Sequence, residues 1–265
     1  MDNKQIEVKN LKVGYDEITV MEEMNLAIPK GRISIIIGPN GCGKSTLLKT
    51  ISRILKPAEG EVLLDGKSIA RRAPKEVAKR MAVLPQSPTA PGDLLVKELV
   101  GYGRFPYQKP MSGFSKEDIE IVNWAMEATG ISEFANRSVA ALSGGQRQRV
   151  WIAMALAQKT DILVLDEPTT YLDMANQLEI LTLLKRMNHE MSITILIVMH
   201  ELNNAIKFAD YIVGMKSGKL LFNGIPKEVI TEKNLRDLFD IEASIQMDET
   251  NTFPICTNYE LIEGC

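Results

Sequence analysis

The chain has 265 residues, of which 45% are hydrophobic and 25% are charged, which suits one large domain or two small ones of ordinary globular composition. Its 31 basic and 34 acidic residues are interspersed and leave a net charge of −3, so nothing indicates a nucleic-acid-binding surface. Three scattered cysteines without a CxxC pair make a poor disulfide framework or metal site and are typical of a reducing compartment.

The sequence also gives no sign of a targeting or membrane segment. The N-terminus lacks the apolar core of a signal peptide. The mostly apolar run at residues 193–199 is too short to span a bilayer. We therefore expect a cytoplasmic protein that reaches a membrane only through a partner.

Short β-like stretches separated by turns are predicted in the opening part of the chain, at residues 6–13, 20–28 and 61–64. Residues 33–37 differ from these, because they are apolar on both faces apart from Ser34, as in a strand buried on both faces. Residues 162–165 and 193–199 show the same pattern, and each lies next to helical sequence. Buried strands that alternate with helices predict an α/β fold with a parallel sheet covered on both sides.

The middle of the chain changes character. Prolines at positions 85, 88, 91, 106 and 110 precede a helical pattern from Ser115 to Thr129. Glu117 and Asp118, close behind Ser115, are typical of a helix start. We interpret this part as a mostly helical insertion in the α/β core. After Gly224 a helix-like run leads into a weakly patterned tail, which we expect to pack on the core.

A glycine-rich segment, GPNGCGKST, follows the strand at 33–37 and matches the phosphate-loop pattern G-x-x-x-x-G-K-[ST]. Its glycines allow backbone N–H groups to turn toward a phosphate, and a helix expected to begin near Ser45 directs its positive end at the same anion. Lys44 can reach the β- and γ-phosphates, and the Ser45 hydroxyl can ligate Mg²⁺. The predicted nucleotide-binding residues of this loop are Gly38, Pro39, Asn40, Gly41, Cys42, Gly43, Lys44, Ser45 and Thr46.

Two consecutive carboxylates follow the buried strand in the segment ILVLDEP. Residues at the carboxyl ends of parallel strands face the ligand crevice, so Asp166 is placed to hold Mg²⁺ directly or through water. Glu167, one residue further, is a candidate to orient or deprotonate an attacking water. Alone, such a pair is more often an ordinary strand-end turn, but beside a phosphate loop the metal and catalytic interpretation is favoured.

The segment LSGGQRQR, residues 142–149, indicates a second anion-binding helix start. Ser143 suits a helix N-cap, and the two glycines after it keep the first N–H groups open. The alternative is a loop before a helix that only packs. Two phosphate-binding helix starts in one chain of this size would be unusual without a functional reason.

LSGGQRQR resembles the signature sequence of ATP-binding-cassette (ABC) ATPases, and GPNGCGKST and ILVLDEP extend the resemblance over about residues 4–225. It implies a P-loop NTPase core with a mostly parallel central sheet, an N-terminal antiparallel β-subdomain and a helical insertion subdomain. The implied organisation is one ABC ATPase domain at 1–225, with the helical subdomain at about 87–160, and a C-terminal helix and tail at 226–265.

Four further positions match the family one by one. Tyr15 stands where an aromatic stacks on adenine, Gln86 in the Q-loop, Asp173 in the D-loop and His200 at the switch histidine. Alone, Tyr15 is more often a half-buried strand-end aromatic, Gln86 an ordinary loop residue and His200 a structural histidine. The order and spacing of the whole set favour the functional interpretation, whereas His189, in a polar helical setting, is interpreted as structural.

The resemblance implies an ATPase that uses ATP and Mg²⁺ and works as a head-to-tail pair of cassettes, a homodimer for a chain of this kind. The phosphate loop of one copy and the signature of the other close over one ATP. Gln86 is expected to relay the state of the site to the helical insertion. The implied metal-binding positions are Ser45, Gln86 and Asp166, the catalytic ones Glu167, His200 and Gln86, and the signature contacts Ser143, Gly144, Gly145 and Gln146.

Longer segments resemble the ATPases of iron–siderophore importers, the group that includes vitamin B12 importers. Among these segments, GYGRFPYQ and TTYLD are the most specific to that group. This implies a peripheral subunit on the cytoplasmic face of the membrane that energises uptake of a ferric siderophore through a separate permease. The permease is expected to dock on the insertion near Gln86 to Pro110, and an extracytoplasmic substrate-binding protein acts indirectly. Vitamin B12, haem or another iron chelate stay open as cargo.

The alternative from another class is a soluble cassette protein that acts on ribosomes or DNA. Such proteins usually carry paired cassettes or long coiled-coil insertions, whereas this chain has one cassette, a short insertion and no basic stretch. A non-hydrolysing regulator is disfavoured because Glu167 and His200 are both present.

Cys42 lies inside the phosphate loop, which suggests sensitivity of the enzyme to thiol alkylation. The alternative is a small loop residue with a shielded sulfur.

Overall fold

The computed structural model describes residues 4–16, 18–109 and 113–262. The chain divides into two compact units. The flanking unit is built from both ends of the chain, Met1–Arg71 and Thr194–Cys265, and the inserted unit is Arg72–Ile193. The boundaries of the predicted helical part, residues 87–160, stay a prediction. Pro110 and the first and last three residues of the chain lie outside the described residues.

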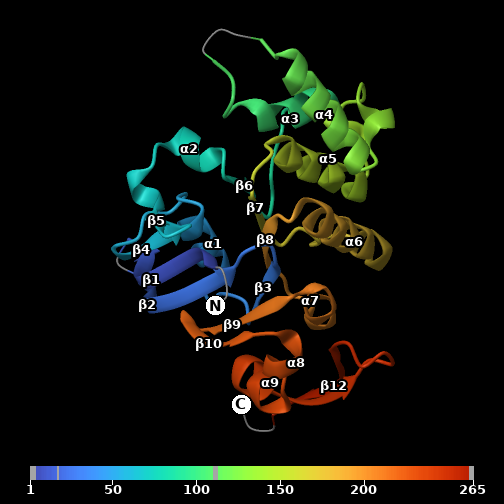
Figure 1. Ribbon diagram of the computed structural model, residues 1–265. Coiled ribbons are helices and arrows are strands. Elements are labelled where there is room, and N and C mark those ends of the chain that lie inside the picture. Colours follow the sequence, from blue (N-terminus) through green and yellow to red (C-terminus); the bar gives the residue numbers. More distant parts are fainter. Residues whose placement is uncertain (1–3, 17, 110–112, 263–265) are drawn as a thin grey trace. The chain divides into compact units, whose positions relative to one another are not determined.

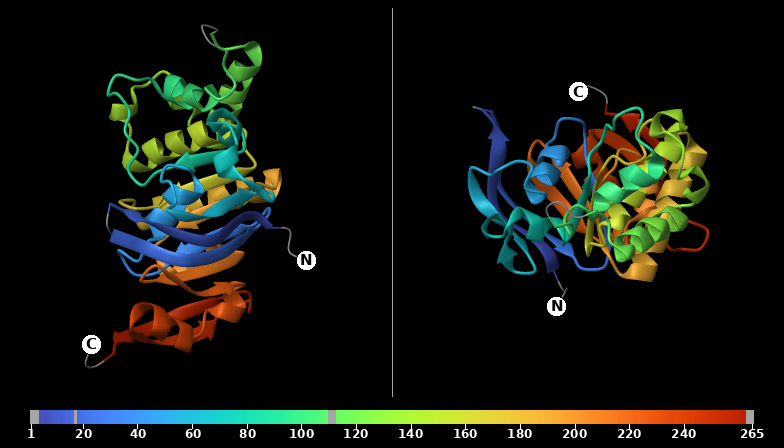
Figure 2. Two further views of the ribbon diagram at one scale, coloured as in Figure 1. Left: turned by 90° about the vertical axis from the view of Figure 1, so that its left-hand side faces the viewer. Right: turned by 90° about the horizontal axis from the view of Figure 1, so that it is seen from above.

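Strands dominate the flanking unit (Figures 1 and 2). Its strands are β1 Lys4–Tyr15, β2 Ile18–Pro29, β3 Ile33–Ile37, β4 Glu59–Leu64, β5 Lys67–Ser68, β8 Thr194–Val198, β9 Tyr211–Lys216, β10 Lys219–Gly224, β11 Ile241–Met247 and β12 Pro254–Leu261. Its helices are α1 Lys44–Ile51, α7 Leu202–Phe208, α8 Pro226–Val229 and α9 Glu232–Phe239.

These strands form an antiparallel sheet and a mostly parallel group. The antiparallel sheet has the order β2-β1-β4-β5, as the family resemblance implied. In the second group β3 pairs in parallel with β8 and with β9, while β10 is antiparallel to β9. Ile33 is level with Ile195 of β8, and Ile35 is level with Ile212 of β9.

The core of the flanking unit contains β3 and β8, because every residue of both strands is buried. A strand without a polar face is stable only where both faces of its sheet are covered. The strands predicted at residues 33–37 and 193–199 are therefore confirmed, apart from one residue at each end of the second.

The end of the chain is more regular than the sequence indicated. The helix-like run after Gly224 forms two helices, because Thr231 accepts a hydrogen bond from the Asn234 N–H (3.1 Å) and begins α9 as its N-cap. The weakly patterned tail forms a hairpin of β11 and β12, with contacts to α9 and α7. Asp248 closes the hairpin turn, and its hydrogen bonds, foremost that from the Thr250 hydroxyl, lower its pKa to about 2.

The inserted unit contains two parallel strands and the longer helices. Its elements are α2 Pro74–Ala78, β6 Met81–Leu84, α3 Val96–Gly101, α4 Lys116–Ala128, α5 Gly144–Ala157, β7 Ile162–Asp166 and α6 Met174–Met191. β6 pairs with β7, and α5 packs against α3 and α4 (Figure 1). Parallel strands and helices in both units confirm the predicted α/β class.

The predicted helix after Ser115 is confirmed as α4. The Ser115 hydroxyl accepts the Asp118 N–H (3.1 Å), and the Asp118 carboxylate accepts the Ser115 N–H (3.0 Å), so the two residues satisfy each other's backbone donors. Within the described residues, no helix combines the length and apolar character that a membrane span requires.

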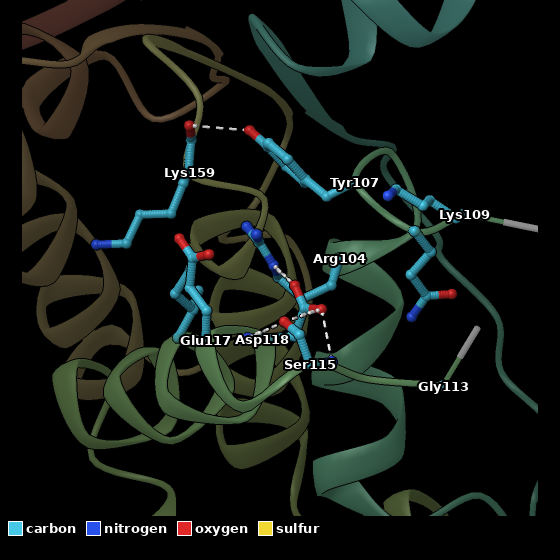
Figure 3. Close-up of a pocket in the computed structure, with 10 residues that line it drawn as sticks. Arg104, Tyr107, Lys109, Gly113, Ser115, Glu117, Asp118 and Lys159 are labelled. Atoms are coloured by element: carbon cyan, nitrogen blue, oxygen red, sulfur yellow. Dashed lines mark hydrogen bonds and ion pairs between the residues drawn. The ribbon is translucent and has the colours of Figure 1, made fainter.

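A buried ion pair joins the helices of the inserted unit (Figure 3). Arg104 Nε donates to Asp118 Oδ1 at 2.8 Å, and the two side chains are 4% and 10% exposed. Arg104 also donates to the Ala157 carbonyl (2.9 Å) at the end of α5. Burial would raise the pKa of Asp118, but hydrogen bonds from Arg104 and Ser115 outweigh it and leave the pKa lowered. The pair thus ties the start of α4 to the end of α5, beside a cavity of about 670 Å³.

Arg104→Met is expected to lower the free energy of unfolding at neutral pH by about 3–5 kcal/mol, because it leaves the Asp118 carboxylate buried without its cation. Since the pKa of Asp118 is lowered in the fold, this contribution is full above the unfolded pKa of about 4 and disappears as the pH falls through the folded value. Urea unfolding measures the loss. The control is Arg236→Met, at an exposed pair with Glu242, with an expected change below about 1 kcal/mol. Equal losses would contradict the role of the buried pair.

Candidate functional site

The predicted phosphate loop connects β3 to α1 in the flanking unit (Figure 1). A Cβ on Gly38 would lie 2.0 Å from the Met215 carbonyl oxygen of β9, so only glycine fits there. Gly43 precedes α1 with a φ of 104°, a left-handed conformation that favours glycine. A left-handed residue followed by helical ones turns successive N–H groups into one concavity, which is a geometry that binds anions.

Lys44 is the buried cation of this loop. It is 5% exposed, and its Nζ donates to the carbonyl oxygens of Gly38 (2.8 Å) and Pro39 (2.9 Å). These neutral acceptors hold the ammonium group at the loop without cancelling its charge. Ser45 and Thr46 follow in the first turn of α1. A buried ammonium, a hydroxyl and helix N-terminal N–H groups together form a donor set that fits a nucleotide phosphate with its Mg²⁺.

Tyr15 and His200, the other predicted site residues of the flanking unit, lie at or just after strand ends. Tyr15 is the last residue of β1 and is 42% exposed. His200 lies two residues beyond β8 and is exposed. An exposed ring can stack on a base and an exposed imidazole can hydrogen-bond a ligand, but both roles stay predictions.

The carboxylate pair lies where β7 ends in the inserted unit. Asp166 is the last residue of the strand and is 8% exposed, a position that suits a cation ligand. Glu167 has a φ of 52°, which is uncommon for a residue with a side chain. Backbone strain of this kind is concentrated at functional sites.

Side chains from two segments hold the Glu167 carboxylate. Gln86, which lies two residues beyond β6, donates from Nε2 to Glu167 Oε2 (2.5 Å). The Thr170 hydroxyl donates to the same oxygen (3.1 Å). The fold thus brings together two predicted catalytic residues that are 81 positions apart in the chain. It also adds Thr170, which the sequence analysis missed and which only its position three residues after Glu167 could have indicated.

The signature segment begins α5 as a capped helix. The Ser143 hydroxyl accepts the Gln146 N–H (3.3 Å), and Gln146 Oε1 accepts the Ser143 N–H (3.0 Å). Gly144 is exposed and Gly145 is buried. A Cβ on Gly145 would lie 2.3 Å from Asn176 Oδ1, so this glycine lets the start of α5 pack on the start of α6.

Asp173 begins α6 as its N-cap. Its Oδ1 accepts the Asn176 N–H and its Oδ2 accepts the Asn176 side-chain amide, both at 2.8 Å. These bonds, the backbone one foremost, lower the pKa of Asp173. The residue therefore has a local structural role, and its contact with nucleotide stays a prediction.

Cys42 is shielded in the fold. It is 4% exposed, and burial raises the pKa of its thiol although Lys44 acts in the opposite direction. The thiolate is the form that reacts with alkylating reagents, so both observations argue for the shielded sulfur rather than for a reactive one.

We expect native protein treated with N-ethylmaleimide to be labelled at Cys42 at least about tenfold more slowly than protein unfolded in urea. Peptide mapping by mass spectrometry measures the labelling of each cysteine, with and without Mg-ATP. Rapid labelling of the native protein that Mg-ATP prevents would restore the reactive interpretation.

Comparison with known proteins identifies the family. The family model of the ABC transporter matches residues 21–170. The iron(3+)-hydroxamate import ATP-binding protein FhuC of Bacillus subtilis is 51% identical over 259 residues, 98% of this chain and 96% of that protein. The petrobactin import ATP-binding protein FpuD of Bacillus anthracis is 50% identical over 253 residues, 96% of this chain and 93% of that protein.

A solved structure agrees with this assignment. It is an ATP-binding cassette determined as a dimer in a post-hydrolysis state, bound to ADP and phosphate. Its TM-score is 0.71 at 30% identity, and the match covers 83% of this chain and 98% of that chain. The chain therefore belongs to the ABC transporter family and is an ATP-binding, ATP-hydrolysing cassette of that family.

Proposed function

We propose that this protein is the ATP-hydrolysing subunit of a bacterial ABC importer and that it energises uptake of a ferric siderophore or a related iron chelate. The observation that carries the proposal is the identity of 50–51% to two import ATP-binding proteins along nearly the whole of each chain. The cargoes named for those two relatives differ, so the proposal is for a class of chelate rather than one compound. Vitamin B12 and haem are the competing cargoes.

In the proposed nucleotide site, the phosphate loop and Lys44 bind the phosphates of ATP, and Tyr15 stacks on the adenine. Ser45, Asp166 and Gln86 would hold Mg²⁺, which supplies neutralisation of the phosphate charge. A magnesium ion commonly takes one or two protein ligands beside phosphates and waters. The hydroxyl, carboxylate and amide of these three residues are oxygen donors of the kind that this ion prefers.

Hydrolysis in this proposal is phosphoryl transfer to water, which depends mainly on positioning and charge neutralisation. Glu167 orients the attacking water and accepts its proton, and His200 hydrogen-bonds the transferred group. Gln86 senses the occupied site and relays its state to the helical part. The hydrogen bonds from Gln86 and Thr170 to one oxygen of Glu167 support the role of Glu167, because they restrict the directions in which its carboxylate can point.

A second copy of the chain completes the site. The residues that open α5 begin a fourteen-residue helix, and in this proposal its N-terminal N–H groups form a second anion-binding helix start besides that of α1. We infer that they contact the γ-phosphate of ATP held by the other copy, and that the D-loop residue Asp173 lies at the same interface. Similarity to a cassette solved as a dimer supports this. The inferred signature contacts are Ser143, Gly144, Gly145 and Gln146.

The permease is proposed to dock on the helical part, near Gln86 to Pro110, of which Pro110 lies outside the described residues. Tyr102 and Phe105 are 39% and 53% exposed, and their ring centroids lie 4.7 Å apart. Exposed aromatic pairs are typical of protein–protein interfaces. This docking would make the cassette a peripheral subunit on the cytoplasmic face of the membrane, with an extracytoplasmic binding protein acting through the permease.

Glu167→Gln is expected to leave ATP affinity intact and to lower the hydrolysis rate by about a hundredfold or more, because the amide cannot accept a proton from water. The variant should also accumulate as an ATP-bound dimer on size-exclusion chromatography. Glu133→Gln, an exposed carboxylate of the same unit, is the control and should hydrolyse at the parent rate. An unchanged rate in Glu167→Gln would remove Glu167 as the water-directing residue.

Cells that lack this chain are expected to lose uptake of labelled ferric siderophores, and the tagged chain should co-purify with a polytopic membrane permease. Complementation with the parent chain should restore uptake, whereas a chain with Lys44→Ala should not, because it lacks the phosphate-binding ammonium. If such cells lost only the uptake of vitamin B12 or of haem, that compound would replace the ferric siderophore as the assigned cargo. Recovery of ribosomes or DNA in place of a permease would reject the importer function.

A further inference from the structure

We propose that Thr170 is a positioning residue for Glu167, and that its hydroxyl sets the direction of the carboxylate that acts on water. The proposal rests on the role of Glu167 in the proposed function. It starts from one oxygen, Glu167 Oε2, which accepts hydrogen bonds from the Thr170 hydroxyl (3.1 Å) and from Gln86 Nε2 (2.5 Å). Two donors on one oxygen hold that oxygen in place and so restrict the directions in which the other oxygen can point.

The two donors differ in how firmly the fold holds them. Thr170 belongs to the same tight turn as Glu167, which its own N–H closes by donating to the Glu167 carbonyl (3.3 Å). The two residues between them are buried, and one is a proline with a fixed φ. The β-branched side chain of Thr170 has few rotamers. Its hydroxyl is therefore a built-in partner of the carboxylate.

Gln86 is the less permanent donor. It is exposed and lies beyond the end of β6, on a long side chain with free rotation about several bonds. In the proposed function Gln86 would also hold Mg²⁺, so its side chain has a second role besides the hydrogen bond to Glu167. Thr170 is assigned no such second role and is the donor dedicated to the Glu167 carboxylate.

The turn that contains Thr170 also adjoins the signature helix. Asp173 follows it as the N-cap of α6, and Asn176 in the first turn of α6 packs against Gly145 at the start of α5. The segment that orients Glu167 is therefore continuous with the segment on which the signature helix rests. This continuity places Thr170 where the binding of a second copy can act on the water-directing carboxylate.

The test compares steady-state hydrolysis by the full chain, at high protein concentration and with Mg-ATP, in variants of Thr170. Thr170→Val removes the hydroxyl at nearly constant volume and is expected to lower kcat by about ten- to a hundredfold, the rate equivalent of one hydrogen bond to a charged group, with KM for ATP within about twofold. Thr170→Ser keeps a hydroxyl and should recover kcat to within about threefold of the parent.

Thr160→Val is the matched control, because Thr160 is a half-buried threonine of the same unit that donates one hydrogen bond, to the Ile162 carbonyl (2.8 Å). It should leave kcat and KM unchanged. ATP affinity and the thermal unfolding midpoint are measured for every variant. Should Thr170→Val not fold, Thr170→Ala removes the same hydroxyl without the second methyl group and carries the same expectation.

The outcomes separate this inference from the function on which it rests. Glu167→Gln is assayed in parallel, and a parent-like rate in that variant rejects both the role of Glu167 and the positioning role of Thr170. If Glu167→Gln is inactive while Thr170→Val keeps its kcat, only the positioning role is overturned. A raised KM with unchanged kcat, or a serine variant as slow as the valine variant, also overturns it, because either result assigns Thr170 to binding or to packing.

Discussion

The close approach of Gly38 to the Met215 carbonyl oxygen fixes the point at which β3 becomes the phosphate loop. β3 is buried along its whole length and pairs on its two sides with β8 and β9, so its end cannot shift without disturbing a close-packed core. The left-handed Gly43, the buried ammonium of Lys44 and the start of α1 all follow from that point. A rigid strand thus gives a glycine-rich loop one defined shape, and the proposed binding of a phosphate anion depends on that shape.

The inserted unit repeats this arrangement at the end of β7. A fully buried strand ends at Asp166, the chain turns at Glu167, and α6 begins after Asp173. The two carboxylates that act in the proposed hydrolysis therefore stand at a strand end and on one short turn, which hold their backbone in place. The contact between Gly145 and Asn176 joins this turn to the signature helix, so the proposed anion binding at α5 and the direction of the carboxylate depend on one packed segment.

The cargo and the use of ATP are supported by different kinds of observation. The groups proposed to bind and hydrolyse ATP belong to this chain, and their chemistry can be derived from its residues. The transported chelate passes through a separate permease in the proposed function and never touches this subunit. Only similarity to import proteins along the whole chain therefore supports the iron-chelate class.

Local patterns in the sequence by themselves determined the α/β class, the buried strands at β3, β7 and β8, the helix caps at Ser115 and Ser143, and the motif residues of the site. Each of these depends on neighbours within a few positions, through apolar runs, capping pairs or glycine spacing. Only the tertiary structure decided that Gln86 reaches Glu167, that Cys42 is shielded and that the tail folds as the β11–β12 hairpin. The physical reason is that contacts between segments far apart in the chain leave no local pattern. β11 alternates apolar and polar residues, but that pattern does not say which segment it pairs with, and β12 alternates only in part. A hydrogen bond across 81 residues likewise exists only after the chain has folded.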